Sequence, residues 1–161
     1  MTRPSNMSDL TETLAQPVSR EERIRMNAVA KDPVTQGKLL RQDLTDRVRL
    51  AMRTGDVHRR LKERMIDVNE IIKKYVPDGS TFDYAEKVLQ SAGFELEARP
   101  TPESPGRFVG SEFEFDVNAG LGFGQEQFEG GVRCAVTLRP AGPYDHGSVH
   151  HVLVYCGYYS L

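Results

Sequence analysis

The chain has 161 residues, of which 39% are hydrophobic and 27% are charged, which is enough for one folded domain with a tail or arm. No run approaches the roughly 18 apolar residues of a membrane-spanning helix, and the first residues lack the apolar centre of a signal peptide, so we expect a cytoplasmic protein with no membrane partner. The net charge of −2 hides an uneven distribution of charge along the chain. Residues 20–64 carry 13 Lys/Arg and 7 Asp/Glu, whereas residues 65–161 carry 7 Lys/Arg and 14 Asp/Glu. The two parts therefore either attract each other or bind different partners.

The first part of the chain divides into a tail and a helical arm. Residues 1–19 are polar, contain two prolines and show no periodicity, which predicts a disordered tail. Residues 20–64 are predicted to form a basic helical arm, which Gly55 interrupts. Within it apolar residues recur every four positions, the spacing of an amphipathic helix, at Leu40, Leu44, Val48 and Met52.

Two further helices are predicted on either side of a "PDGS" turn. The first runs from Val57 to Tyr75, because its apolar residues are three or four positions apart. The second begins at an N-cap formed by Ser80 or Thr81 and ends at Gly93, a residue that adopts the left-handed conformation of a helix end. Its apolar face consists of Phe82, Ala85, Val88 and Leu89.

After Gly93 the apolar period changes to two, which is typical of strands with one solvated face. The segment "RFVGSEFEFDV" is predicted to be one such strand, and its acidic residues are expected to face the arginines of the next strand. The last run, "HHVLVYCGYY", is apolar on both faces and fits a central strand. Helices followed by strands predict an α+β fold in which an antiparallel sheet of about four strands packs on helices, with residues 65–161 as the α+β domain.

The segment "KKYVPDGSTFDYAEKVLQSAGF", residues 73–94, resembles the helix–turn–helix entry of the BamE/SmpA-like modules, which are similar in shape to the β-lactamase inhibitor protein. The positions that match are Gly79, Ser80 or Thr81, Ala85, Leu89 and Gly93. The chain departs from the lipoprotein members in having no lipidated cysteine after a signal peptide. The resemblance implies a protein that binds other proteins and performs no chemistry of its own.

The glycine-rich stretch "NAGLGFGQEQFEGG", residues 118–131, is predicted to be a wide connection between strands. A dinucleotide cradle needs G-x-G-x-x-G followed by a helix, whereas here a strand pattern follows and Glu126 and Glu129 would repel a phosphate. Phe123 and Phe128 are then aromatic side chains at a loop tip. Such rings are suited to insertion into a cleft of a partner protein.

The histidines and cysteines offer weaker candidates for chemistry. Tyr144, Asp145, His146, His150 and His151 lie close together in sequence. On a strand, however, the last two point to opposite faces, so one metal ion cannot easily take both. Cys134 and Cys156 lie in apolar strand patterns and are predicted to be reduced core thiols, since a disulfide requires an oxidising compartment. Nothing near Cys156 activates its thiol for a nucleophilic role with His150.

These patterns together predict a protein-binding module of the inhibitor, immunity or adaptor type that is not an enzyme and has no cofactor or metal. Acidic charge would steer a basic partner such as a toxin nuclease, and aromatic rings would anchor it. One alternative is a nucleic-acid-associated protein that binds through the basic arm, and another is a small metal-dependent or His-based hydrolase. Self-association through the helical stripes is also open. The predicted partner-binding residues are Phe123, Phe128, Glu112, Glu114, Asp116 and Glu126.

Overall fold

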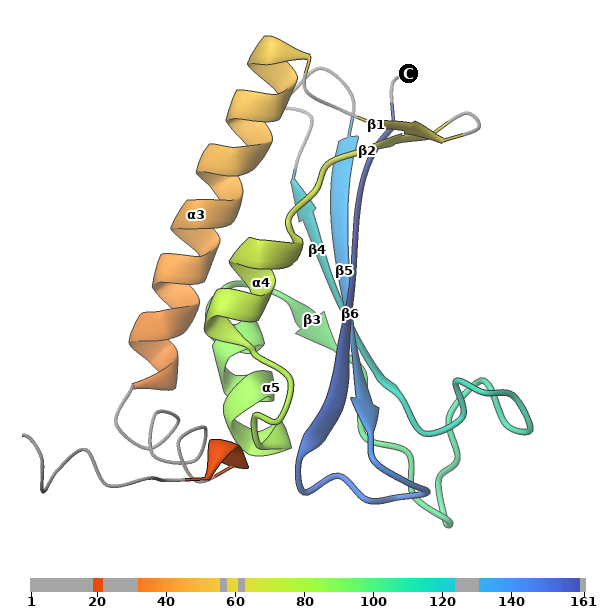
Figure 1. The fold of residues 1–161 in the computed structure, drawn as a ribbon. Helices are drawn as coiled ribbons and strands as arrows, with labels where there is room; N and C mark the ends of the chain where they lie inside the picture. The colour runs from red at the N-terminus through yellow and green to blue at the C-terminus, as the bar shows by residue number, and fades with distance from the viewer. Residues whose placement is uncertain (1–18, 22–31, 56–57, 61–62, 124–130, 160–161) are drawn as a thin grey trace, which may run out of the picture.

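The computed structural model describes residues 19–21, 32–55, 58–60, 63–123 and 131–159. Helices α3 (Pro33–Thr54), α4 (Asn69–Tyr75) and α5 (Phe82–Ser91) cover one face of an antiparallel sheet (Figure 1). The sheet has six strands in the order β1-β2-β6-β5-β4-β3. Their bounds are His58–Arg60 for β1, Glu63–Met65 for β2, Glu95–Leu96 for β3, Val117–Phe123 for β4, Gly131–Pro140 for β5 and Val149–Tyr159 for β6. The predicted α+β fold is confirmed, with four strands after the last helix and two short ones before α4.

Helix α3 forms where the apolar stripe predicted it. The side chain of Asp32 accepts hydrogen bonds from the amides of Val34 and Thr35, and Gly55 ends the helix with φ 71°. Its inner face packs against α5, and Gly37 lies so close to α5 that an added Cβ would meet the side chain of Ser91 and the carbonyl of Val88. The stripe residues share one hydrophobic core with residues from α4, α5 and the sheet, so α3 is packed within the same unit as residues 65–161.

The predicted helix from Val57 to Tyr75 is wrong over its first two thirds. Residues 58–60 and 63–65 form the strands β1 and β2, and among the described residues of this segment only Asn69–Tyr75 is helical. Met65 pairs with Gly157 of β6, and the amide of Ile66 donates to the carbonyl of Cys156 at 2.9 Å. Pairing with the sheet therefore overrides the helical spacing of the side chains.

Helix α5 follows the prediction closely. The Thr81 hydroxyl accepts a hydrogen bond from the amide of Tyr84 and so forms the N-cap, while the Ser80 hydroxyl donates to the Pro77 carbonyl. Gly93 has φ 100°, as expected at a helix end. The predicted apolar face is buried against α3 and the sheet. No helix within the described residues is long and apolar enough to cross a membrane.

The boundary between turn and strand lies elsewhere than predicted. Residues 107–116, predicted as a strand, form successive turns in which the amides of Ser111, Glu114 and Asp116 donate three residues back. The first part of the glycine-rich segment that follows, predicted as a connection over residues 118–131, belongs to strand β4 from Val117 to Phe123, which pairs with β5 along its whole length, while residues 124–130 lie outside the described residues. The backbone of residues 107–116 bonds to itself, so the ladder begins only at Val117.

Candidate binding site

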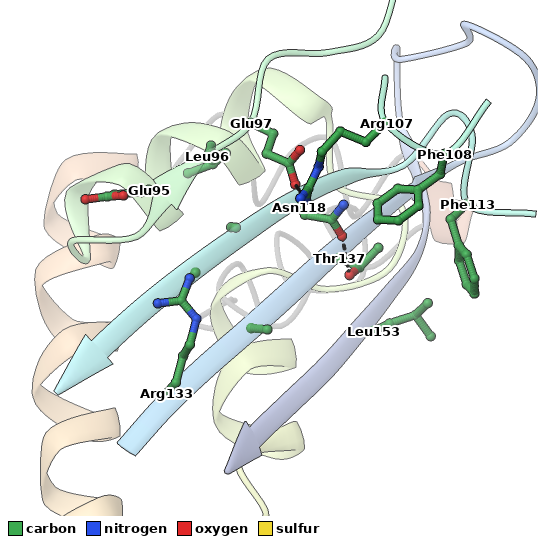
Figure 2. A pocket seen from close by; sticks show the side chains of 13 residues that line it. Glu95, Leu96, Glu97, Arg107, Phe108, Phe113, Asn118, Arg133, Thr137 and Leu153 are labelled. Atoms are coloured by element: carbon green, nitrogen blue, oxygen red, sulfur yellow. Dashed lines mark hydrogen bonds and ion pairs between the residues drawn. The ribbon is translucent and has the colours of Figure 1, made fainter. Parts of the chain in front are cut away.

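The face of the sheet that the helices leave uncovered is hollowed. On β4 the outward positions are Asn118, Gly120 and Gly122, and on β5 the small Ala135 lies beside Gly120 in the register. Small side chains here leave a depression of about 720 Å³ over β3, β4, β5 and β6, within the size range of ligand sites. We call it the open-face hollow. Figure 2 shows its side chains projecting from the sheet and from the turns beside it.

Residues 107–116, which we call the wall segment, bound one end of the open-face hollow. The rings of Phe108 and Phe113 meet edge to face, with 6.2 Å between their centroids. A guanidinium lies over each ring, that of Arg107 at 5.1 Å from Phe108 and that of Arg139 at 5.6 Å from Phe113. Leu153 of β6 lines the same end (Figure 2). The wall is therefore apolar and aromatic, with a cation beside each ring.

A buried ion pair fixes the wall segment to the sheet. Asp116, whose side chain is only 2% exposed, accepts hydrogen bonds from Nε and Nη2 of Arg139 at 3.1 and 2.9 Å. This two-point contact matches the planar guanidinium to the carboxylate. The hydrogen bonds to Asp116 raise the pKa of Arg139. An acidic residue of this segment thus pairs with an arginine of the next strand, but from a buried turn position and not across two strands as the sequence predicted.

The polar groups of the open-face hollow are partly satisfied by one another. The Thr137 hydroxyl donates to the side-chain oxygen of Asn118 at 2.8 Å, and Arg107 forms an ion pair with Glu97 at 2.9 Å. Arg133 differs from these residues. Its guanidinium lies across Gly120, where an added Cβ would collide with Nη2, and it makes no hydrogen bond or ion pair with a described residue. It is the group best placed to take a carboxylate from outside.

The predicted partner-binding residues do not come together at one surface. Phe123 was expected on a loop tip, but it is the last residue of β4, only 4% exposed, with the guanidinium of Arg41 over its ring. Its predicted position is wrong because the glycines before it form a strand. Asp116 was expected on an open acidic face and is buried in its pair with Arg139. Phe128 and Glu126 lie outside the described residues.

The remaining two predicted residues lie on the wall segment. Glu112 is exposed, and Glu114 is half-buried and accepts a hydrogen bond from the amide of Gly110 at 3.1 Å. Because Asp116 and Glu97 are each neutralised by an arginine, the acidic face expected from the sequence is reduced. The wall segment therefore exposes more apolar side chain than unpaired acidic side chain at this end of the hollow.

The candidate histidines make different contacts and do not form one cluster with Asp145. His146 lies edge to face with Phe82 at 5.0 Å, and its Nε2 is 2.9 Å from the carbonyl oxygen of Phe115. His150 and His151 contact each other, and Nδ1 of His151 is 3.8 Å from Asp78. The described residues contain no group of three or more His, Cys, Asp or Glu side chains arranged to hold a metal ion.

The described part of the basic arm turns some of its charge inward. Arg41 of α3 donates to the carbonyl of Ala92 at 3.2 Å, and Arg47 donates to that of Asp67 at 3.2 Å. On the outer face Asp46 accepts a hydrogen bond from Gln42 at 3.0 Å. These contacts leave less cationic surface for phosphates than the count of residues 20–64 suggested.

The open-face hollow was not predicted from the sequence, and none of the predicted partner-binding residues that the structure describes lines it; the side chains that do include Phe108, Arg133 and Leu153. A signal for the floor was present, since Gly120 and Gly122 alternate on one face of a run that also alternates Val117, Ala119, Leu121 and Phe123. Comparison of the chain with protein-family models, with curated proteins and with solved structures found no match. The site is therefore interpreted from its own chemistry.

Proposed function

We propose that this protein is a non-enzymatic protein-binding module that takes an apolar segment of its partner in the open-face hollow. The supporting observation is the exposure of large apolar side chains at one place. Of the seven such side chains exposed among the described residues, Leu153 and three of the wall segment, Phe108, Val109 and Phe113, lie on this face or beside it, each between 41% and 60% exposed. Clusters of this kind mark interaction sites on soluble proteins.

The lining of the hollow suits a partner with both apolar and acidic groups. Phe108, Phe113 and Leu153 provide apolar contact, and aromatic rings of this type often contribute most to interface energy. Arg133 provides a planar donor for a carboxylate of the partner. The sequence also suggested a basic partner that is steered by acidic residues. In this proposal such a partner would contact Glu95 and Glu112, because Glu97 and Asp116 already form ion pairs with arginines.

A comparative pulldown from the native cell lysate tests the proposal. The bait is the full chain as wild type, as Phe108→Ala with Leu153→Ala, and as Leu39→Ala with Leu50→Ala. The last variant is a matched control, because it removes two side chains of similar exposure, 47% and 44%, from the opposite, helical side of the molecule. We expect a protein that wild type and the control retain and the hollow variant loses.

The captured protein is then expressed alone, and its affinity is measured by calorimetry against the same three baits. A loss of at least tenfold confined to the hollow variant supports the proposal, since removing two buried contacts from an interface costs about 1 kcal/mol or more each. Equal affinity for all three baits would contradict it. Recovery of nucleic acid alone, equally with all baits, would instead favour binding through the basic arm.

A further inference from the structure

Cys134 of β5 and Cys156 of β6 are direct partners in the antiparallel register of the sheet. Both side chains belong to the hydrophobic core and are 0% and 1% exposed. Both thiols are free. Because the two residues are directly opposite each other with side chains on the same side of the sheet, the distance between their Cα atoms depends on which kind of antiparallel pair they form.

The backbone of β6 shows which kind of pair this is. The carbonyl of Cys156 accepts a hydrogen bond from Ile66, on the β2 side of the strand, at 2.9 Å. The amide of Val152, which has the same orientation as Cys156, donates away from β5 to the carboxylate of Asp78, also at 2.9 Å. Since the N–H and C=O of one strand residue point to the same side, Cys156 sends neither group toward β5. The two cysteines therefore form a non-hydrogen-bonded pair.

This pairing places the two cysteines close to the backbone separation of a disulfide. In a non-hydrogen-bonded pair the Cα atoms are about 4.5 Å apart and the side chains lie closer together than in the other kind of pair. A disulfide needs a Cα separation of roughly 4.4–6.8 Å. Hydrogen bonding with Cys156, followed by burial, raises the pKa of the Cys134 thiol, as expected for two neighbouring buried thiols.

We propose that Cys134 and Cys156 are a redox modification site that forms a cross-strand disulfide when the protein meets a disulfide oxidant such as glutathione disulfide. One cysteine thiolate attacks the oxidant, breaks its S–S bond and releases one glutathione. The second cysteine then displaces the other glutathione from the mixed disulfide. Two protons and two electrons leave the protein, and the oxidant is reduced to two molecules of glutathione.

The new bond joins the two central strands behind the open-face hollow. It closes a loop of residues 134–156 and so reduces the conformational freedom of the unfolded chain. Ala135 and Leu153, which line the hollow, lie within this loop. The oxidised protein is therefore expected to be more resistant to unfolding. Because both thiols are buried, oxidation is expected to require transient separation of β5 and β6.

The experiment uses the full chain in a glutathione redox buffer, with urea below the unfolding midpoint so that the strands open transiently. Trypsin cleaves after Arg133 but not at the Arg139–Pro140 bond, so residues 134–161 form one peptide that holds both cysteines. After denaturation and alkylation without reductant, we expect this peptide to be unalkylated and two hydrogens lighter than its dithiol form. We also expect a higher midpoint of urea unfolding, reversed by dithiothreitol.

Cys134→Ala and Cys156→Ala are the controls, because each leaves one thiol that can form only a glutathione adduct. Neither control is expected to gain resistance to urea in the same buffer. A wild-type peptide that still carries two alkyl groups after equilibration would overturn the proposal. So would a disulfide-containing protein whose midpoint is unchanged or lower, because the geometry would then be strained.

Discussion

The ion pair between Asp116 and Arg139 gives a test in which the two single substitutions have unequal effects. The carboxylate is 2% exposed, whereas the guanidinium is 28% exposed and can reach water. Replacing Arg139 by Leu leaves a buried carboxylate without its two hydrogen bonds, which destabilises a fold by about 3 kcal/mol. Replacing Asp116 by Asn keeps the shape and leaves a cation that water can still reach, so we expect a loss of about 1.5 kcal/mol.

The double variant, Asp116→Asn with Arg139→Leu, sharpens the test. Once the carboxylate is absent, removal of Arg139 leaves no buried charge, so the double variant is expected to be more stable than Arg139→Leu alone by about 1 kcal/mol. The measurement is urea unfolding followed by circular dichroism, with the four proteins forming a double-mutant cycle. Additive losses, or a smaller loss for Arg139→Leu than for Asp116→Asn, would show that the carboxylate is not desolvated as the structure has it.

Three further predictions follow from other contacts. Gly37→Ala is expected to destabilise the protein by about 1–3 kcal/mol, because the added Cβ would collide with α5. Gly122→Ala has open space around the new Cβ and should change stability by less than about 0.5 kcal/mol. Thermal unfolding of the two variants and the wild type measures the difference. Burial, together with a hydrogen bond to a carboxylate of α3, raises the pKa of Tyr75 from 10.0 to about 12, so its contribution to the free energy of unfolding is complete below pH 10 and is lost between pH 10 and 12. Tyr75→Phe should therefore flatten the fall in stability over that range, and an unchanged slope would refute the assignment. Phe123→Ala should cost about 3 kcal/mol in urea unfolding and Phe108→Ala less than about 1, since the first ring is buried and the second half-exposed; comparable losses would contradict their placement.

The parts of the fold that the sequence predicted are those in which local and long-range preferences agree. Helix α5 combines a capping hydroxyl at Thr81, an apolar face and a terminal glycine at Gly93. Strand β5 buries Val132, Cys134, Val136 and Leu138, so the core position predicted for Cys134 is confirmed. In both segments, burial of the apolar face requires no change in the local preference of the backbone.

Two of the wrong predictions of secondary structure fall where hydrogen bonding between distant segments decides the structure. The spacing from Val57 to Tyr75 fits a helix, yet Met65 and Ile66 bond to β6 about ninety residues later. The alternation of Phe and Glu in residues 107–116 fits a strand, but the segment forms turns. The glycines of β4 disfavour a strand by intrinsic preference, but pairing with β5 on one side and β3 on the other stabilises it. None of these partners is visible in the local pattern.

The open-face hollow depended on these same errors. The floor of the hollow was expected to be a loop and one of its walls was expected to be a strand. The residues of the floor and of the wall were therefore not expected to line one site. With the boundary moved to Val117, the glycines lie under the depression and the aromatic residues of 107–116 stand beside it. The chemistry of the residues was visible in the sequence, but their arrangement required the strand pairing.

The arrangement of the sheet also agrees with the proposal that a partner binds its open face and not the part of β6 that β2 leaves unpaired. An uncovered strand edge offers unpaired amides to any other strand. Along β6, Asp78 accepts a hydrogen bond from the amide of Val152, while Gly79 and Ser80 bond to the backbone of Val149. Near the other end of the strand, Ile66 donates to Cys156. Addition of a partner strand would have to displace these contacts, whereas docking on the open-face hollow covers exposed apolar side chains and breaks no hydrogen bond of the ladder.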